Sequence, residues 1–260
     1  MSKTTHIDHL GRKIILNTYP KKIVSLVPSQ TELLINLGLK HLLVGITNFC
    51  IHPQKDISLK TKIGGTKTPK LNTILGLAPD LIIANKEENN LNDIEALSKN
   101  TNVWVSDINS YEDNFKLIVD LGILFNKYTE ATSLCTEIKD NWKNIPTVKS
   151  KSCLYFIWRK PYMLAGKDTF INSVLDKSNF DNIISKNRCP TLSIEQLSIL
   201  NPELVLLSTE PYSFKEKHIS EFREIFPKAI IKIVDGELFS WYGSRQKLLP
   251  PYLIELKKSL

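Results

Sequence analysis

The chain contains few glycines, prolines and cysteines: 10, 13 and 4 respectively among 260 residues. So few glycines and prolines exclude a collagen-like or largely disordered chain. None of the cysteines forms a C-x-x-C pair, which excludes a zinc ribbon and a thioredoxin-like redox site. Free thiols and a single disulfide both fit the four positions, which are Cys50, Cys135, Cys153 and Cys189.

Long apolar runs are also missing. Nowhere does the sequence approach the roughly 20 apolar residues that a membrane-spanning helix needs. The segment from Met1 to Asp8 contains no apolar core, no small-residue cleavage site and no lipoprotein cysteine. The sequence therefore predicts a soluble chain without a transmembrane segment and without an export signal.

Charge of one sign is not concentrated anywhere, although the formal net charge is +7. The lysines are scattered along the chain and mixed with aspartates and glutamates. A nucleic-acid-binding protein would gather its basic residues in one arm or on one helix. We therefore predict a solvated basic surface and no nucleic-acid partner.

The common catalytic motifs are absent. The sequence contains no G-x-S-x-G elbow, no Walker phosphate loop and no G-x-G-x-x-G dinucleotide fingerprint. The five histidines show no zinc-binding spacing, and Cys50 with His52 is an isolated pair. We therefore predict no catalytic residue, no metal site and no intrinsic cofactor.

What the sequence does contain is an alternation of short apolar strands and amphipathic helices. Residues 21–27 predict a buried strand, and a helix follows, with Ser29 as N-cap and Glu32 completing a capping box. Residues 42–46 predict the next strand, so this part indicates a parallel strand–helix–strand unit. Further strands are predicted at 81–84, 103–105, 153–157, 204–207 and 230–234.

The segment 111–143 has a strong helical pattern, and no proline interrupts it. We predict one continuous helix, about 50 Å long at 1.5 Å per residue, that joins two lobes. The alternative is two helices broken near Gly122 or Asn126. The pattern consists of apolar residues three or four positions apart, at Phe115, Ile118, Leu121, Leu124, Tyr128, Ala131, Leu134, Ile138 and Trp142.

An internal repeat lies on either side of this segment. Residues 71–82 and 194–205 share an apolar-x-x-apolar-x-x-Leu-x-Pro-acid-Leu-apolar pattern at a constant offset of 123. Its physical meaning is an amphipathic helix that proline stops before a buried strand. One copy in each half indicates two lobes built to the same plan.

Aromatic residues cluster in two segments that follow predicted strands. The first is 158–162, with the sequence WRKPY, and the second is 239–245, with the sequence FSWYGSR. Open α/β sheets bind ligands beyond the carboxyl ends of their strands. Rings and guanidinium groups there suit large, flat ligands with an anionic edge.

The sequence resembles the periplasmic substrate-binding proteins for cobalamin and iron–siderophore complexes, the helical-backbone receptors of the TroA-like superfamily. The resemblance extends over about residues 20–250. It rests on IVSLVPSQTELL at 23–34, VGITNFC at 44–50, IGG at 63–65, LAPDLI at 77–82, the segment 111–143, and 239–245.

The resemblance implies an α/β fold with two Rossmann-like lobes joined by a single long α-helix, the class III periplasmic-binding-protein fold. The expected boundaries are an N-terminal lobe at 1–110, the helix at 111–144 and a C-terminal lobe at 145–260. The ligand would lie between the lobes, in contact with Ser29, Gln30, Asn48, Phe49, Gly65, Thr66, Trp158, Tyr162, Trp241, Tyr242 and Arg245. Arg245 or Arg159 would meet an anionic edge of the ligand.

The function that the resemblance implies is capture of a chelate for an ABC importer, without a covalent step. The ligand would be cobalamin or another corrinoid, a ferric siderophore, or haem. Acidic residues on the lobe surfaces would dock onto the permease, with Glu87 or Glu88 in one lobe and Glu210 or Glu216 in the other. We expect a monomer. The resemblance places it in the periplasm or at the cell surface, whereas the unexported start leaves the cytoplasm open.

Two alternatives use the same fold without import. One is a cytoplasmic enzyme, for which Glu32, Cys50 and His52 are the available polar residues, or a ligand-sensing protein. The other is a scaffold that holds a partner protein.

Overall fold

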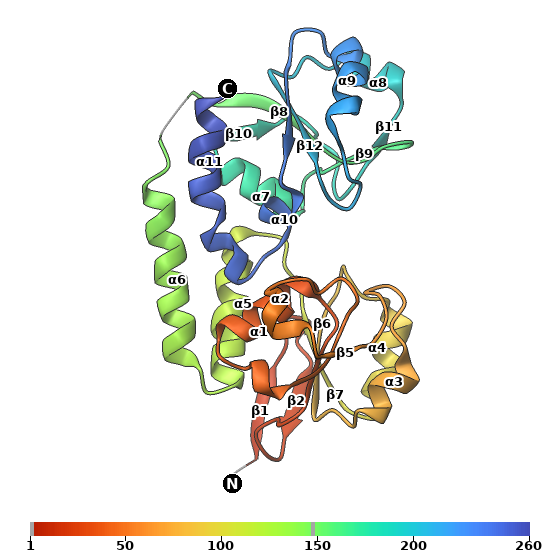
Figure 1. Cartoon of the computed structure of the whole chain (residues 1–260), viewed down its shortest axis with the longest axis vertical. Coiled ribbons are helices and arrows are strands. Elements are labelled where there is room, and N and C mark those ends of the chain that lie inside the picture. Colours follow the sequence, from red (N-terminus) through yellow and green to blue (C-terminus); the bar gives the residue numbers. More distant parts are fainter. Residues whose placement is uncertain (1–2, 147–148) are drawn as a thin grey trace. The chain divides into compact units, whose positions relative to one another are not determined.

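The computed structural model describes residues 3–146 and 149–260, and the chain forms two compact units (Figure 1). Unit 1 comprises Met1–Ile108, Glu112–Lys139 and Tyr242–Arg245. Unit 2 comprises Asn109–Tyr111, Asp140–Trp241 and Gln246–Leu260. The lobe boundaries expected from the sequence resemblance were at residues 110 and 144. The observed division differs, because unit 1 also includes Glu112–Lys139 of the helical segment and Tyr242–Arg245 from the C-terminal half of the chain.

Unit 1 is built on a five-stranded parallel sheet in the order β5-β4-β3-β6-β7. The chain starts at the central strand, adds two strands on one side and then two on the other, which is the Rossmann arrangement. The strands are β3 (Ile23–Ser25), β4 (Leu43–Ile46), β5 (Thr61–Lys62), β6 (Leu81–Asn85) and β7 (Asn102–Ser106). The helices between them are α1 (Pro28–Asn36), η1 (Lys40–Leu42), α2 (Gln54–Ile57), α3 (Leu71–Gly76) and α4 (Leu91–Ser98).

Helices cover both faces of this sheet, which explains why its central strands are apolar throughout. On one face, Ile74 of α3 and Leu97 of α4 pack against Ile82 and Val103 of the strands. On the other face, Thr31 of α1 donates a hydrogen bond to Ser25 of β3, over 2.8 Å.

The start of α1 corrects the predicted capping box. Val27 is the N-cap residue, its side chain caps nothing, and Pro28 occupies the first helical position. Proline is favoured there because its missing N–H would have no helical partner. Glu32 therefore does not cap α1 and is available for another role.

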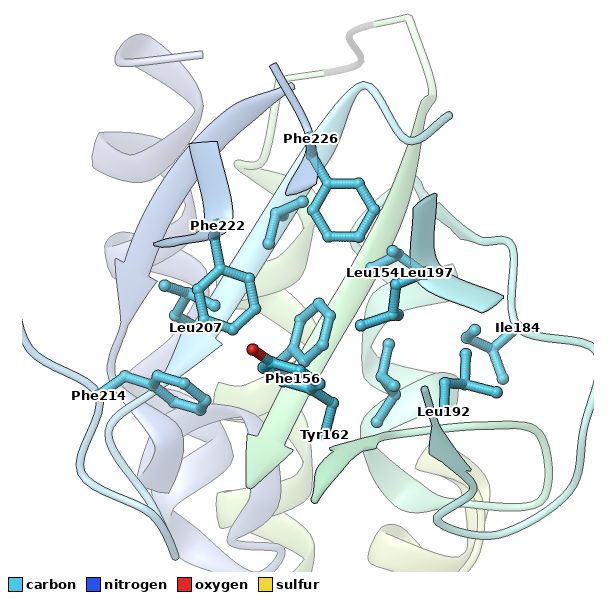
Figure 2. Close-up of a cluster of buried hydrophobic side chains, with 12 residues drawn as sticks. Leu154, Phe156, Tyr162, Ile184, Leu192, Leu197, Leu207, Phe214, Phe222 and Phe226 are labelled. Atoms are coloured by element: carbon cyan, nitrogen blue, oxygen red, sulfur yellow. The ribbon is translucent and has the colours of Figure 1, made fainter. Parts of the chain in front are cut away.

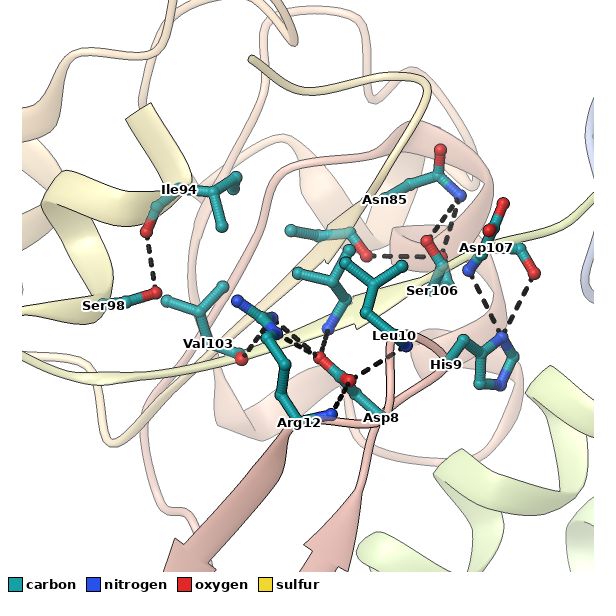
Figure 3. A network of polar contacts seen from close by, with 12 residues as sticks. Asp8, His9, Leu10, Arg12, Asn85, Ile94, Ser98, Val103, Ser106 and Asp107 are labelled. Atoms are coloured by element: carbon teal, nitrogen blue, oxygen red, sulfur yellow. Dashed lines mark hydrogen bonds and ion pairs between the residues drawn. The ribbon is translucent and has the colours of Figure 1, made fainter. Parts of the chain in front are cut away.

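The chain begins with a hairpin formed by β1 (Thr4–Ile7) and β2 (Lys13–Leu16), paired antiparallel. The loop between them covers the edge strand β7, and Figure 3 shows the contacts. Asp8, which is buried, accepts hydrogen bonds from the backbone N–H groups of Leu10, Arg12 and Val105. It also forms an ion pair of 2.7 Å with Arg12, whose guanidinium donates to the carbonyl of Val103.

Replacing Asp8 by alanine should lower the free energy of unfolding by about 2 kcal/mol, because three backbone donors lose a charged acceptor. Urea denaturation followed by circular dichroism measures the change. Asp140→Ala is the control, since the ion pair between Asp140 and Lys143 is exposed and contributes at most about 1 kcal/mol. Equal losses in the two variants would contradict the role of Asp8.

The single helix predicted over 111–143 is wrong, and the two-helix alternative with a break at Asn126 is correct. The segment forms α5 (Tyr111–Leu124) and α6 (Tyr128–Lys143). Asn126 has a φ of 53°, a left-handed conformation that asparagine tolerates better than most residues. Gly122 of α5 lets α6 come close, because a Cβ at Gly122 would lie 2.4 Å from the Cβ of Ala131. Helix α6 begins in unit 1 and ends in unit 2.

Unit 2 is built on a six-stranded mixed sheet with a parallel centre. Its order is β11-β9-β8-β12-β13, and β10 also pairs with β8. The strands are β8 (Lys151–Trp158), β9 (Tyr162–Leu164), β10 (Phe180–Asn182), β11 (Thr191–Leu192), β12 (Leu204–Ser208) and β13 (Ile230–Val234). The helices are α7 (Phe170–Lys177), α8 (Ile194–Ser198), η2 (Glu216–His218), α9 (Ile219–Ile225), α10 (Gly236–Ser240), η3 (Ser244–Lys247) and α11 (Leu249–Lys258).

One face of this sheet carries an aromatic core, drawn in Figure 2. Phe156 of β8 is fully buried, and its ring meets that of Phe222 of α9 edge to face, with centroids 4.8 Å apart. On the opposite face, Tyr155 contacts Phe239 of α10. Helices therefore cover both faces, as in unit 1.

The structure confirms the internal repeat. Strands β6 and β12 begin 123 residues apart, and α3 and α8 precede them at the same offset. The acidic residue of the repeat has one role in both copies. Asp80 accepts hydrogen bonds from the N–H groups of Lys21 and Lys22, just before β3, and Glu203 accepts one from Ser152 in β8.

Two further findings concern membrane-spanning helices and the state of the cysteines. None of the helices within residues 3–146 and 149–260 combines the length and apolar character of a membrane span. All four cysteines are free thiols, so the disulfide alternative does not apply.

Candidate functional site

The carboxyl edge of the unit 1 sheet is the first candidate surface. The strand order reverses between β3 and β6. At such a switch point the loops leave in opposite directions and open a crevice for ligands. Six predicted ligand residues follow strands at this one edge. Ser29 and Gln30 lie in the first turn of α1 after β3, Asn48 and Phe49 lie in the loop after β4, and Gly65 and Thr66 lie in the loop after β5.

A buried polar cluster lies at the centre of this edge. The Gln30 amide donates hydrogen bonds to Ser106 at the end of β7, over 2.5 Å, and to the hydroxyl of Tyr242, over 3.5 Å. Asn85 at the end of β6 donates to the same Ser106 hydroxyl, over 2.9 Å. Burial and the nearby charge of Glu88 raise the pKa of Tyr242, so its phenol stays protonated. The cluster is therefore neutral, and all of its members are buried.

The outer loops of the edge add one exposed ring and one carboxyl group. Phe49 is 60% exposed, and its ring lies against Gly65, where a Cβ would come within 3.3 Å of the ring. The carbonyl of Thr66 accepts a hydrogen bond from Asn89. Glu88 keeps an exposed surface, yet the desolvation caused by surrounding atoms raises its pKa, and Lys67 only partly opposes this.

The carboxyl edge of the unit 2 sheet is the second candidate surface. Trp158 ends β8, is 40% exposed, and meets the ring of Tyr212 edge to face with centroids 5.6 Å apart. Trp241 follows α10, and its indole N–H donates to Glu210 over 3.2 Å. Trp158 and Trp241 were both predicted to contact the ligand. Their partners at this edge, Tyr212 and Glu210, were not.

Glu221 of α9 binds two predicted ligand residues. Arg159 lies in the turn between β8 and β9, and Tyr162 is the first residue of β9. Arg159 forms an ion pair of 2.6 Å with Glu221, and the Tyr162 hydroxyl donates to the same carboxylate. Burial opposes ionisation of Glu221, but the hydrogen bonds from Arg159 and Tyr162 outweigh it and lower its pKa. Burial and Glu221 raise the pKa of Tyr162 to about 12.

Arg245 is buried inside unit 1, where it binds Glu32 of α1. The guanidinium Nε and Nη2 donate to the two carboxylate oxygens over 2.8 and 3.1 Å. Next to it, the N–H of Gly243 donates to Asn114 of α5, and Gly243 has a φ of 88°. Residues 242–245 are therefore fixed to α1 and α5, and ligand contact by Arg245 stays a prediction.

Two of the three polar residues named for the enzyme alternative, Cys50 and Glu32, are buried and engaged in other contacts. Cys50 is buried, and desolvation raises its pKa despite hydrogen bonds with Thr31 and Thr47. Its thiol therefore stays protonated near neutral pH, and Glu32 is held by Arg245. Over the described ranges, 3–146 and 149–260, His, Cys, Asp and Glu side chains form no group that could hold a metal ion.

Comparison with known proteins identifies the family. The sequence pattern that defines a family described as periplasmic binding protein matches residues 23–231. The chain belongs to the periplasmic binding protein family. The fold predicted from the sequence resemblance, two Rossmann-like α/β units, is thereby confirmed, apart from the length of the linking helix.

Individual relatives of this periplasmic binding protein are distant. It is 27% identical over 213 residues to an uncharacterised ABC transporter substrate-binding lipoprotein of Bacillus subtilis, covering 76% of this chain and 67% of that protein. It is 24% identical over 200 residues to a vitamin B12-binding protein of Vibrio campbellii, covering 74% of this chain and 72% of that protein.

Solved structures share the fold of this periplasmic binding protein. The vitamin B12-binding protein of Vibrio cholerae superposes with a TM-score of 0.78 at 17% identity, covering 93% of this chain and 98% of that one. A haem-binding protein of Pseudomonas aeruginosa superposes with a TM-score of 0.75 at 19% identity, covering 91% and 92%. At these identities the likeness shows the fold alone.

Proposed function

We propose that this protein is the substrate-binding component of an ABC importer that captures a corrinoid or a related metal chelate. The match of the family pattern to residues 23–231 carries the proposal. Curated relatives named vitamin B12-binding proteins, from Vibrio campbellii and Vibrio parahaemolyticus, support the corrinoid. Ferric siderophores and haem are the variants to be compared with it.

The ligand surfaces in this proposal are the carboxyl edges of the two sheets. Exposed rings at Phe49 and Trp158 suit a broad, flat face of the ligand. The neutral cluster of Gln30, Ser106 and Tyr242 is buried, and it fixes the start of α1 to the end of β7 at the unit 1 edge. No covalent step is required of these residues. That the ligand lies between the two lobes stays a prediction.

Docking to the permease would use the loops that follow the repeated strands. Glu87 and Glu210 each lie two residues beyond their strand, β6 and β12, at the repeat offset of 123. The N–H of Glu87 donates to Asn85 and that of Glu210 to Ser208, so the two loops begin alike. We favour this equivalent pair over Glu88 and Glu216. A periplasmic or cell-surface location follows from the same proposal.

Titration of the purified protein with cyanocobalamin, haem and ferric siderophores tests the proposal. Isothermal calorimetry or quenching of tryptophan fluorescence should give a Kd below about 100 μM for one of these chelates, since import at low concentration needs useful affinity. Failure of every chelate to bind below that limit would refute the proposed function.

A further inference from the structure

The ring of Tyr212 supports Trp158, the indole that unit 2 exposes at its carboxyl edge. The two rings meet edge to face, with centroids 5.6 Å apart. Tyr212 lies in the segment 209–215, which follows β12 and has no regular secondary structure. Its backbone N–H donates to the carbonyl of Ile157 over 3.3 Å, which is a long hydrogen bond. The side-chain contacts of Tyr212 therefore matter for the position of its ring.

The polar contact of Tyr212 is with His218, the last residue of η2, which is buried. The backbone N–H of Lys215 donates to Nδ1 of His218 over 2.9 Å. Nδ1 therefore carries no proton, and the neutral imidazole carries its proton on Nε2. Nε2 lies 3.3 Å from the hydroxyl of Tyr212 and donates to it. The imidazole thus connects the main chain at Lys215 with the Tyr212 side chain.

Aromatic contacts fix this imidazole to the core of unit 2. The ring of Phe214 lies 5.7 Å from that of His218 and 4.8 Å from that of Tyr212, measured between centroids. Phe214 is buried and meets Phe222 of α9 edge to face in the aromatic core (Figure 2). A buried imidazole with both nitrogens engaged is therefore a rigid support for Tyr212.

A second group acts on the same hydroxyl, but it is held less firmly. The guanidinium of Arg159 also forms a hydrogen bond with Tyr212. Its side chain is about one quarter exposed and is already paired with Glu221. The buried contact from His218 is therefore the firmer restraint on Tyr212.

We infer that His218 is a positioning residue for the chelate: through the Tyr212 hydroxyl it holds the ring that supports Trp158. This inference rests on the proposed function, because it needs Trp158 to contact the ligand. It adds a residue that influences affinity without touching the ligand. The physical reason is that an aromatic ring held in place before binding loses less side-chain entropy when a ligand packs on it.

Protonation of His218 would break this arrangement, because the proton gained on Nδ1 would face the Lys215 N–H and two donors would oppose each other. Burial is the main cause that lowers the pKa of His218. Nearby cations lower this pKa further and Glu221 opposes them; the cations are Arg159, Lys217 and Lys215. The neutral form therefore holds Tyr212 at neutral pH, and the support should be lost on acidification, below the ordinary histidine pKa of about 6.5.

The indole N–H signal of Trp158 in an NMR spectrum tests the inference without any ligand. The chain has four tryptophans, and the signal of Trp158 is identified by its absence from the spectrum of Trp158→Phe. It should shift as the pH falls from about 7.5 to about 5, and the shift should be absent in His218→Gln. The signal of Trp142, which packs against Tyr111, is the control and should not follow the same titration. A Trp158 signal that ignores pH, or that shifts equally in His218→Gln, would refute the inference.

Two substitutions of His218 separate the support of Tyr212 from a general effect on the fold. In His218→Gln the longer amide can still donate to the Tyr212 hydroxyl but cannot titrate. In His218→Asn the shorter amide can accept from the Lys215 N–H but cannot reach Tyr212. At pH 7.5 the asparagine variant should bind cyanocobalamin about fivefold more weakly than the wild type, which corresponds to one hydrogen bond, and the glutamine variant should stay within about twofold.

The hydroxyl of Tyr212 provides a matched test of the same contact. Tyr212→Phe keeps the ring beside Trp158 and should weaken binding about as much as His218→Asn, and the double variant should lose no more than either single one. Wild-type affinity should fall about fivefold on acidification, whereas that of His218→Gln should not share this fall. Burial also raises the pKa of Glu88 in unit 1, but its contribution is the same in both proteins and cancels in the comparison.

The outcomes distinguish this inference from the proposed function. Haem or a ferric siderophore replaces cyanocobalamin if the wild-type protein binds only one of those. Equal affinities of the asparagine and glutamine variants, both verified as folded by thermal melting, would overturn the role of His218 while leaving capture of a chelate intact. Binding of no chelate would overturn the proposed function, and the pH response of the Trp158 signal would still decide whether His218 positions that ring.

Discussion

Replacing Arg245 by methionine should lower the free energy of unfolding by about 3–5 kcal/mol, which we expect to be the largest effect of a single substitution at the candidate site. The substitution leaves Glu32 buried and without the two donors that now bind its carboxylate oxygens. Glu32 and Arg245 are only 8% and 7% exposed, so water cannot replace the guanidinium without rearrangement of α1.

The expected result has a second part, because the ion pair fixes a segment from the C-terminal half of the chain to unit 1. The double variant Glu32→Gln with Arg245→Met should recover part of the lost stability, since no uncompensated charge stays buried. Urea denaturation of the three proteins measures these differences. Arg159→Met is the matched control, and it should cost less because its ion pair is one quarter exposed. A loss below about 1 kcal/mol for Arg245→Met would contradict the structural role.

Local patterns predicted most of the fold. Strand β13 begins and ends where its apolar run does, and the proline of each repeat separates α3 from β6 and α8 from β12. These signals are reliable because they act over neighbouring residues: a side-chain period or a missing N–H. The short strands β9, β10 and β11 and the helix α9 have weaker patterns, and they were not predicted.

The break between α5 and α6 shows where periodicity misleads. Leu124 and Tyr128 lie four residues apart on either side of the break, so the apolar spacing continues through it. Only the local residues carry a signal: Asn126 tolerates a left-handed backbone, and Gly122 permits close contact with Ala131. A regular apolar pattern therefore predicts that a segment is helical, but it does not predict that the segment forms a single helix.

The sequence predicted which types of residue lie at the candidate site, but not which side chains pair with one another there. Aromatic segments after strands led to Trp158 and Trp241, which do lie at a carboxyl edge. The pairing of Glu32 with Arg245 joins residues 213 positions apart, and no local pattern encodes it. The proline at position 28 did carry a signal, since proline at the first helical position moves the cap to Val27 and leaves Glu32 free.

Replacing Trp158 by alanine should weaken binding of the chelate by about 30-fold, roughly 2 kcal/mol, which is typical for truncation of a central aromatic contact. Trp158 is the ring that unit 2 exposes at the end of β8, and its edge-to-face contact with Tyr212 holds the indole in place. Because the ring is already positioned, little side-chain entropy is lost when a flat ligand stacks on it.

Tryptophan fluorescence reports the same event, because a corrin, haem or ferric chelate in contact with the indole quenches its emission. Trp158→Phe keeps an aromatic face and should retain most of the affinity while losing much of the quenching. Trp142→Phe is the matched control: Trp142 packs against Tyr111 near the end of α6, with centroids 5.2 Å apart, and is not at the carboxyl edge. It should leave the Kd unchanged. If Trp158→Ala bound the chelate as tightly as the wild type, the unit 2 edge would not be the ligand surface, and only the edge at Gln30 and Tyr242 would remain a candidate.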